Sequence, residues 1–410
     1  MKIAIATAVY YPQINGVAVF SHNLALGLAA RGHEVLVLCP SQTGKNYART
    51  ENGVKVNYLK STEAKVYPDQ IHPAKKHGLF YKHGFKVSVF PYRQIKKALN
   101  AFQPDVVHIQ VSDPIGLSVV AYARKYGIPV VTTEHNQPEV ITDPLKMPTP
   151  LKKPMNALLA SYFKNRQSKS DFVTMPTKKA IHHLLGSGKP FPVPVAAVSN
   201  GVDLTSFKPG RAPAKIYEKY HIDKSAKIAL YVGRVDPEKS VGTVIEAFNE
   251  ARLKVPHAEL VIVGDGVDRT RLEALVKTLG IADKVRFLGR VLPPELYELY
   301  KLGDVFVTAS EIETQGIVLA EAAATGLPLI AVDSGAVSEV CITGKNGYLC
   351  KPGDVAEIKD ALESILTDDA LRTKFSENSL KIASEHDFNH TLDQFINIYE
   401  RVIKQRYSKS

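Results

Sequence analysis

Short apolar runs alternate with helix-period stretches along the whole chain. The runs are rich in β-branched residues and have the length of buried strands. Stretches with apolar residues three and four positions apart fill most of the intervals between them. This alternation is typical of parallel sheets covered by helices on both faces. The predicted strands are 2–9, 33–39, 105–110, 129–135, 171–177 and 195–200 in the first half, and 227–233, 258–266, 284–289, 304–310 and 327–333 in the second.

A segment dense in Gly and Pro, residues 186–203, separates the two halves and predicts a linker. We place the domain boundary near residues 195–203. The first predicted domain is 1–197 and the second is 198–386, and each has the strand and helix pattern of a Rossmann-like domain.

Composition supports a folded chain of two ordinary domains. The 410 residues are 45% apolar, and the three cysteines lack the spacing of a disulfide framework or a zinc site. No apolar run has the length of a spanning helix, and the first residues are predicted to form a strand rather than a signal peptide. We expect a reduced, cytoplasmic setting.

The net charge of +11 is concentrated in the first half. Residues 60–97 contain nine Lys or Arg and two acids, and residues 146–189 contain nine Lys or Arg and one acid. A solvated basic face explains this pattern, and so does a surface that meets an anionic partner such as a membrane, a phosphorylated acceptor or a nucleic acid.

Two carboxylates, Glu313 and Glu321, flank a predicted loop-to-helix junction at Gly316. The first is expected in the loop and the second inside the helix. The backbone N–H groups of Gly316, Ile317 and Val318 would then form an anion site at the helix N-terminus. The carboxylates can accept hydrogen bonds from hydroxyl groups. A phosphate between two polyhydroxylated rings, as in a nucleotide sugar, fits this pattern.

A second motif points to the same ligand. The apolar run 227–233 ends at Gly233, Arg234 follows directly, and Lys239 precedes the next helical stretch. Both cations are therefore expected at the carboxyl end of a parallel strand, where open α/β sheets bind ligands. Arginine offers a planar fork for phosphate, and lysine offers a point charge.

With Gly16 in an Asn-Gly-Val sequence, these residues resemble the family 4 glycosyltransferases of the GT-B fold. The resemblance covers nearly the whole chain. It implies an α/β architecture of two Rossmann-like domains whose parallel sheets face across a cleft, with the acceptor on the first domain and the donor on the second. It also implies that a last helix, residues 387–410, returns to the first domain. The other matching pieces are RGHEV at 31–35, PDVVH at 104–108, SNGVD at 199–203, VGDG at 263–266 and VRFLG at 285–289.

The resemblance assigns roles to individual residues. It implies that Arg234 and Lys239 bind the diphosphate, that Glu313 holds hydroxyls of the donor sugar, and that Glu321 holds the ribose. Gly16 lets a loop approach the phosphates. The full expected donor set is Gly16, Gly233, Arg234, Lys239, Arg286, Phe287, Glu313, Gln315, Gly316, Ile317, Val318 and Glu321, and the expected catalytic set is Glu313, His135, Arg234 and Lys239.

Arg234, Lys239 and the helix N-terminus after Gly316 can stabilise the negative charge of the leaving diphosphate without a metal ion. The sequence contains no Asp-x-Asp, the metal-holding motif of the alternative GT-A enzymes. We therefore expect no metal and no cofactor, with the nucleotide sugar as substrate. Members of this kind retain the anomeric configuration, and the leaving phosphate is thought to help deprotonate the acceptor.

The form ETQG around Gln315 resembles bacterial diacylglycerol glucosyltransferases and related lipid-directed enzymes. The predicted function is transfer of a hexose, with UDP-glucose as donor, to a membrane lipid or a glycan. The protein would be peripheral on the inner face of the membrane, with no nucleic-acid partner. The residues expected at the membrane or acceptor are Lys75, Lys76, Phe80, Tyr81 and Lys82, although a mobile loop also explains their segment.

Other functions stay open. A GT-B nucleotide-sugar epimerase would consume the donor without an acceptor. The alternatives also include a transferase that uses GDP-mannose, UDP-N-acetylglucosamine or a soluble acceptor. An NAD-dependent dehydrogenase is disfavoured because the first predicted strand is not followed by G-x-G-x-x-G.

Overall fold

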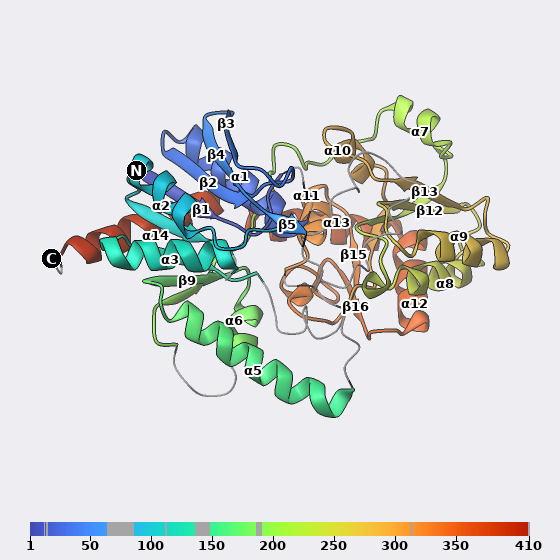
Figure 1. Cartoon of the computed structure of the whole chain (residues 1–410). Coiled ribbons are helices and arrows are strands. Elements are labelled where there is room, and N and C mark those ends of the chain that lie inside the picture. Colours follow the sequence, from blue (N-terminus) through green and yellow to red (C-terminus); the bar gives the residue numbers. More distant parts are fainter. Residues whose placement is uncertain are drawn as a thin grey trace. The chain divides into compact units, whose positions relative to one another are not determined.

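The chain folds as two compact units in the computed structural model, which describes residues 1–11, 13, 15–63, 86–110, 113–135, 148–185, 191–311, 313 and 315–408 (Figure 1). The N-terminal unit is Met1–Ser199 with Thr391–Ser410, and the C-terminal unit is Asn200–His390. The division thus falls between Ser199 and Asn200, rather than between residues 197 and 198. Hydrogen bonds explain its place, because the Ser199 carbonyl accepts from the Thr391 hydroxyl, whereas the Asn200 N–H donates to Gln315 Oε1.

The N-terminal unit contains an eight-stranded sheet with the order β10-β9-β8-β7-β1-β2-β4-β3. All its pairings are parallel except that of β3 with β4. A separate antiparallel pair joins β5 to β6. The elements are β1 Lys2–Ala6, α1 Gly16–Ala30, β2 Glu34–Pro40, β3 Tyr47–Glu51, β4 Val54–Leu59, β5 Thr62–Glu63, β6 Lys86–Val87, α2 Tyr92–Phe102, β7 Val106–Ile109, α3 Pro114–Tyr126, β8 Val130–Thr133, α5 Thr149–Gln167, β9 Phe172–Met175, α6 Lys178–Leu185 and β10 Val195–Ala197.

The C-terminal unit contains a six-stranded parallel sheet with the order β13-β12-β11-β14-β15-β16. The elements are α7 Ala214–Tyr220, β11 Lys227–Val232, η1 Pro237–Lys239, α8 Val241–Ala251, β12 Ala258–Val263, α9 Arg269–Thr278, β13 Val285–Gly289, α10 Glu295–Tyr300, β14 Val305–Val307, α11 Ile317–Ala324, β15 Leu329–Val332, η2 Val337–Glu339, β16 Gly347–Cys350, α12 Val355–Thr367 and α13 Asp369–Ser384. Helix α14, Phe388–Tyr407, follows and is part of the N-terminal unit from Thr391 onward.

The strand pattern of the C-terminal unit explains its two cores. Along β11, Ala229 and Tyr231 belong to one buried cluster with helices α8 and α12, while Leu230 and Val232 belong to another with α10 and α11. Successive side chains of a strand point to opposite faces, so a strand that is apolar at every position requires cover on both sides. This arrangement places the polar loops at the ends of the strands.

The last helix, α14, packs on the N-terminal unit from Thr391 onward, a few residues later than the predicted start at 387. Its buried residues recur at helical spacing. The Phe395 ring lies 5.9 Å from that of Phe20 and 5.1 Å from that of His108, measured between centroids. The C-terminal end of the chain thereby contributes core residues beside helix α1 and strand β7.

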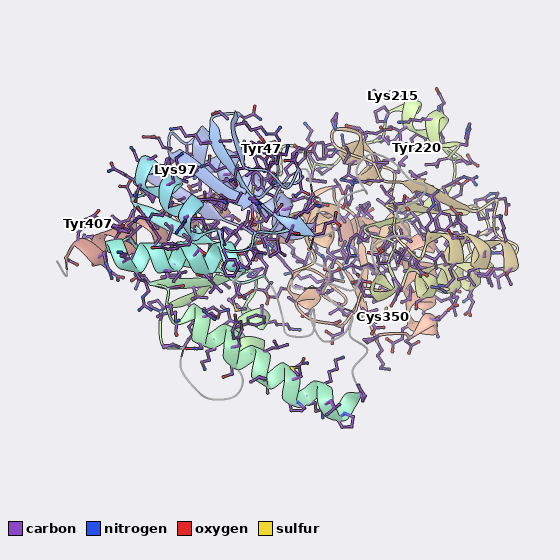
Figure 2. The ribbon with its side chains drawn as sticks, in the orientation of Figure 1. Tyr47, Lys97, Lys215, Tyr220, Cys350 and Tyr407 are labelled. Atoms are coloured by element: carbon purple, nitrogen blue, oxygen red, sulfur yellow. The ribbon has the colours of Figure 1, made fainter. Side chains whose placement is uncertain are left out.

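The hairpin of β3 and β4 was not predicted. It lies at the edge of the sheet, where the Tyr47 ring, labelled in Figure 2, stacks on that of Tyr58 with centroids 4.3 Å apart. β16, at an edge of the C-terminal sheet, was also missed.

The three cysteines, Cys39, Cys341 and Cys350, are unpaired and buried. None of the helices in the described part of the chain combines the length and the apolar character needed to cross a bilayer.

Candidate active site

The strand order of the C-terminal unit creates a switch point between β11 and β14. From β11 the chain proceeds outward through β12 and β13, and then returns to place β14 on the other side of β11. Loops that leave the carboxyl ends of two such strands diverge to opposite faces of the sheet, and ligands of open α/β sheets bind between them. Here the two loops are 233–239 and 308–316.

Lys239 and Glu313 meet at this switch point. The Lys239 ammonium donates to Glu313 Oε1 at 2.7 Å and to Ser310 Oγ at 3.1 Å. Only 16% of the Lys239 side chain and 18% of the Glu313 side chain are exposed. A cation from the β11 loop and a carboxylate from the β14 loop are therefore held together, as expected if both serve one ligand site.

Gly335 and Ala336, which follow the neighbouring strand β15, lie against the Glu313 loop. The Glu313 carbonyl accepts from the Ala336 N–H at 3.3 Å. Gly335 has a φ of +54°, and a Cβ there would lie 2.2 Å from the Glu313 carbonyl oxygen. Glycine is required on both grounds, since a side chain would be strained and would also displace the loop.

We expect Gly335→Ala to lower kcat by about tenfold to a hundredfold, because an error of about 1 Å in a positioned group has effects of that size. Gly344→Ala is the matched control. Gly344 has a φ of +74°, and a Cβ there would meet nothing within 4 Å, so this substitution carries the backbone strain without the collision. Steady-state kinetics and melting temperatures of both variants test this, and equal losses of kcat would contradict it.

Arg234 is the second cation of the β11 loop and is paired within that loop. Its guanidinium contacts the Asp236 carboxylate and donates to Glu238 Oε1 at 2.6 Å, while 51% of the side chain stays exposed. The buried Tyr231 hydroxyl donates to the Arg234 carbonyl at 2.6 Å. Gly233 leaves room for that hydroxyl, since a Cβ there would lie 2.9 Å from it. An anion can reach Arg234, in competition with two carboxylates.

Helix α11 begins directly after the Glu313 loop. Gly316 caps it with a φ of +74°, a conformation that favours glycine. Within the part of the chain that the structure describes, the backbone N–H groups of Gly316, Ile317 and Val318 meet no protein acceptor. These donors and the helix dipole together favour an anion at this end.

Gln315 is buried, and its Oε1 accepts from the Asn200 N–H at 3.0 Å. This contact fastens the β14 loop to the first residue of the C-terminal unit. The side-chain oxygen of Gln315 thus holds the loop, and its membership of the donor set stays a prediction.

Glu321 lies in α11 and receives a hydrogen bond from a buried tyrosine. The Tyr300 hydroxyl donates to Glu321 Oε2 at 2.5 Å. Burial raises the pKa of Glu321 to about 7, although the hydrogen bond from Tyr300 acts in the opposite direction. The carboxyl therefore titrates near neutral pH, which is consistent with a functional group as well as with a buried structural one.

Arg286 and Phe287 lie on β13, away from the switch point. The Arg286 guanidinium is 3.4 Å from Glu259 Oε2 and donates to the His221 carbonyl at 3.2 Å. The Phe287 ring lies 5.9 Å below the Arg269 guanidinium. These side chains are occupied by neighbouring protein groups. The resemblance implies that this strand end contacts the base of the donor mostly through its backbone, and that role stays a prediction.

His135 follows β8 in the N-terminal unit and is 6% exposed. Its Nε2 lies 2.9 Å from Gln110 Oε1, and its ring meets that of Phe20 edge-on at 5.2 Å. An amide oxygen only accepts, so Nε2 carries a proton. Burial lowers the pKa of His135 to about 3. The imidazole is neutral at pH 7 and its orientation is fixed.

Gln110 belongs to a buried polar chain that reaches the last helix. Its Nε2 lies 3.3 Å from His108 Nε2. His108 in turn meets the Tyr399 hydroxyl through Nδ1 and the Thr133 hydroxyl through Nε2, both at 2.7 Å. Helix α14 thereby supports the strand ends that carry His135.

Gly16 is the first residue of α1, whose N-cap Asn15 accepts from the Ala18 N–H at 2.9 Å. The predicted membrane residues Lys75, Lys76, Phe80, Tyr81 and Lys82 lie outside the described residues.

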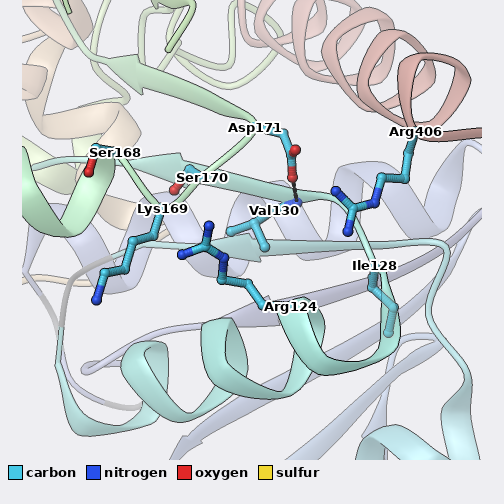
Figure 3. A pocket seen from close by; sticks show the side chains of 8 residues that line it. All are labelled: Arg124, Ile128, Val130, Ser168, Lys169, Ser170, Asp171 and Arg406. Atoms are coloured by element: carbon cyan, nitrogen blue, oxygen red, sulfur yellow. Dashed lines mark hydrogen bonds between the residues drawn. The ribbon is translucent and has the colours of Figure 1, made fainter. Parts of the chain in front are cut away.

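A pocket of about 150 Å³ lies at the amino-terminal ends of β8 and β9 (Figure 3). It opens at the opposite end of β8 from His135, and none of the predicted site residues lines it. Its lining residues are Arg124, Ile128, Val130, Ser168, Lys169, Ser170, Asp171 and Arg406.

Several supporting residues were missed from the sequence. Ser310 shares the Lys239 ammonium, and Tyr300 holds Glu321. Asp236 joins two loops, because its Oδ1 accepts from the Val267 N–H at 3.1 Å. Ser310 could have been predicted, because it is a polar residue that directly follows an apolar strand.

Two α/β units with parallel sheets, and cations beside carboxylates at a switch point, are the features of a GT-B glycosyltransferase. Residues 14–206 match the family described as Glycosyltransferase Family 4, and residues 214–382 match that described as Glycosyl transferases group 1. The chain belongs to the family 4 glycosyltransferases and is a hexosyltransferase.

Relatives named for different reactions resemble the chain to a similar degree. It is 29% identical over 353 residues to an alpha-monoglucosyldiacylglycerol synthase of Acholeplasma laidlawii, covering 85% of this chain and 84% of that one. It is 28% identical to a GDP-mannose-dependent alpha-mannosyltransferase of Mycobacterium tuberculosis, covering 100% of this chain and 99% of that one. A sucrose-phosphate synthase structure from Thermosynechococcus elongatus, 19% identical, matches with a TM-score of 0.76 over all of both chains. The predicted family, fold class and enzyme type are confirmed.

Proposed function

We propose that the protein transfers glucose from UDP-glucose to a membrane lipid, with retention of anomeric configuration and without a metal ion. The observation that carries this proposal is the contact of Lys239 with Glu313 at the switch point. It sets a phosphate-binding cation beside a carboxylate that can hold sugar hydroxyls. The A. laidlawii synthase, similar over most of both chains, supports a lipid acceptor by its name.

The donor diphosphate would be held by three kinds of group. Lys239 supplies an enclosed positive charge, Arg234 an exposed one, and the first N–H groups of α11 supply fixed dipoles. As the glycosidic bond breaks, negative charge grows on the leaving phosphate, and fixed donors stabilise it because they need no reorganisation. Binding of the diphosphate would replace Glu313 as the partner of the Lys239 ammonium.

Glu313, released from part of its ion pair, would accept hydrogen bonds from the glucose hydroxyls and orient the sugar. Glu321 would accept from the ribose hydroxyls. The acceptor hydroxyl loses its proton as the new bond forms, and a leaving phosphate oxygen is the proposed base. His135 of the N-terminal unit, which the resemblance places in the catalytic set, would contact the donor sugar through its neutral imidazole.

The test is incubation with labelled UDP-glucose and a total bacterial lipid extract, followed by partition into organic solvent. We expect label in the organic phase, unchanged by a chelator and lost in Glu313→Gln. The anomeric configuration of the purified product, determined by NMR, tests retention. UDP-glucose left intact beside this extract would reject the donor–acceptor pair.

Transfer of mannose from GDP-mannose is the second candidate. The M. tuberculosis mannosyltransferase matches the chain over its whole length, so its donor competes with UDP-glucose. A parallel incubation with labelled GDP-mannose separates the two donors. Consumption of a donor with no acceptor present, and with conversion of its sugar, would instead indicate a nucleotide-sugar epimerase.

A further inference from the structure

Helix α5 has two apolar faces, and only one is packed against the described part of its unit. Phe163 is buried and packs against Met175 of β9 and against α6. On another face, Leu151, Leu158 and Tyr162 are 58%, 64% and 41% exposed. Their separations of two turns and one turn place them in one stripe along the helix. Figure 1 shows α5 as a long helix lying below β9 and α6.

The charged side chains of α5 have one sign. The sequence of α5, TPLKKPMNALLASYFKNRQ, contains four cations and no acid. The Arg166 guanidinium lies 5.0 Å from the centroid of the Tyr162 ring, so a cation is kept next to the stripe. The cations of the helix are Lys152, Lys153, Lys164 and Arg166.

An exposed stripe of this kind is unfavourable in water and suits the interface of a bilayer. Leucine side chains there leave water, while lysine and arginine extend to the phosphates of the headgroups. Anionic lipids add attraction of about 1 kcal/mol for each nearby cation. A helix with this distribution lies in the plane of the interface, partly inserted.

We propose that the stripe formed by Leu151, Leu158 and Tyr162 binds the surface of an anionic bilayer, with the cations of α5 pairing lipid phosphates. The proposal rests on the proposed transfer to a membrane lipid, and it names the surface that brings the enzyme to its acceptor. Charge favours this occupant over a second copy of the chain, because two such helices would bring cations against cations.

The apolar contribution is tested with the triple variant L151S/L158S/Y162S. We expect binding to vesicles of phosphatidylcholine mixed with phosphatidylglycerol, measured by co-sedimentation without donor, to weaken by roughly tenfold to a hundredfold. The matched control is Leu253→Ser, which removes a 75% exposed leucine from the C-terminal unit. Unchanged binding of the triple variant, or an equal loss in the control, would overturn the proposal.

The electrostatic contribution is tested with K153Q/R166Q. We expect roughly a thirtyfold loss of binding to the mixed vesicles, and a much smaller change with phosphatidylcholine alone. Arg124→Gln is the control, since it removes an exposed cation of the same unit from the pocket in Figure 3. An equal loss in this control would show a diffuse basic surface and overturn the role of α5.

Two further readouts separate this proposal from the proposed function. With lipid acceptor dissolved in detergent, the triple variant should keep its turnover, while on vesicles it should lose it. If the unmodified protein makes no glycolipid but its vesicle binding still depends on the stripe, the proposed function is rejected and the proposed membrane-binding surface is supported. If the triple variant changes the oligomeric state in vesicle-free buffer, the stripe holds a second copy and the membrane assignment is overturned.

Discussion

Replacing Lys239 with methionine should lower kcat by about a hundredfold to a thousandfold without unfolding the protein. The Lys239 ammonium is enclosed and touches both Glu313 and Ser310 at the end of the neighbouring strand. In the proposed reaction this fixed cation stabilises the negative charge that develops on the leaving diphosphate. Methionine keeps an unbranched, flexible stem and removes the charge together with its three donors. Single-turnover rates with labelled UDP-glucose and detergent-dissolved lipid give the size of the loss.

Glu313→Gln should also be severely impaired, because an amide accepts fewer hydrogen bonds from sugar hydroxyls and cannot pair with Lys239. The two groups touch at 2.7 Å, so their effects should not add. The double variant K239M/E313Q is expected to lose little more activity than the worse single variant. Purely additive losses would indicate that the two residues act on separate steps.

Lys227→Met is the matched control for the loss of charge. Lys227 begins β11, the strand whose other end leads to Lys239, and its ammonium lies 3.3 Å from Asp369 Oδ1. Its removal breaks an ion pair with helix α13 at the opposite end of the same strand. We expect an unchanged kcat. A rate for Lys239→Met that equals this control would remove Lys239 from the active site.

The sequence predicted Lys239 and Glu313 individually, but their contact depends on the order of strands. The two residues are 74 positions apart, and each motif identifies only the end of its own strand. They meet because β14 lies directly beside β11. Nothing local determines that order, since it results from how the helices cover both faces of the completed sheet.

The missed hairpin had a local signal. β3 is polar and mostly exposed, so it lacks the apolar pattern by which the other strands were found. Between β3 and β4 stand Asn52 and Gly53, with φ of 47° and 82°. Asn-Gly with positive φ at both positions is the preferred two-residue turn of antiparallel hairpins. The turn could have been predicted where the strand could not.

The buried partners of the site residues had no comparable signal. Tyr300 reaches Glu321 because α10 and α11 pack in one core, and Gln110 reaches His135 because β7 and β8 pair. A tyrosine on an amphipathic helix or a glutamine at a strand end is common, so its partner emerges only from the tertiary structure. These partners nevertheless orient the groups they touch, while burial shifts the pKa values of Glu321 and His135.

The affinity for UDP-glucose should rise by about tenfold between about pH 6 and pH 8, through ionisation of Glu321. The pKa of this carboxyl is raised to about 7, and the ionised form accepts more strongly from the ribose hydroxyls, because protonation turns one carboxyl oxygen into a donor. The diphosphate of UDP-glucose does not titrate in this range. Calorimetric titration at several pH values measures the change, and Glu321→Gln should bind weakly with a flat pH profile.

Folding stability should depend on the same ionisation with the opposite sign. The pKa of Glu321 is raised from 4.5 to about 7 in the folded protein, so its contribution to stability is complete below about pH 4.5 and is lost as the pH rises through about 7. The loss is at most about 3 kcal/mol, because the side chain is only partly buried. Removing the hydroxyl in Tyr300→Phe takes away the donor that lowers this pKa, and should move both pH profiles upward together. Profiles of affinity and stability that move independently would show that Glu321 does not hold the ribose, because one ionisation must govern both.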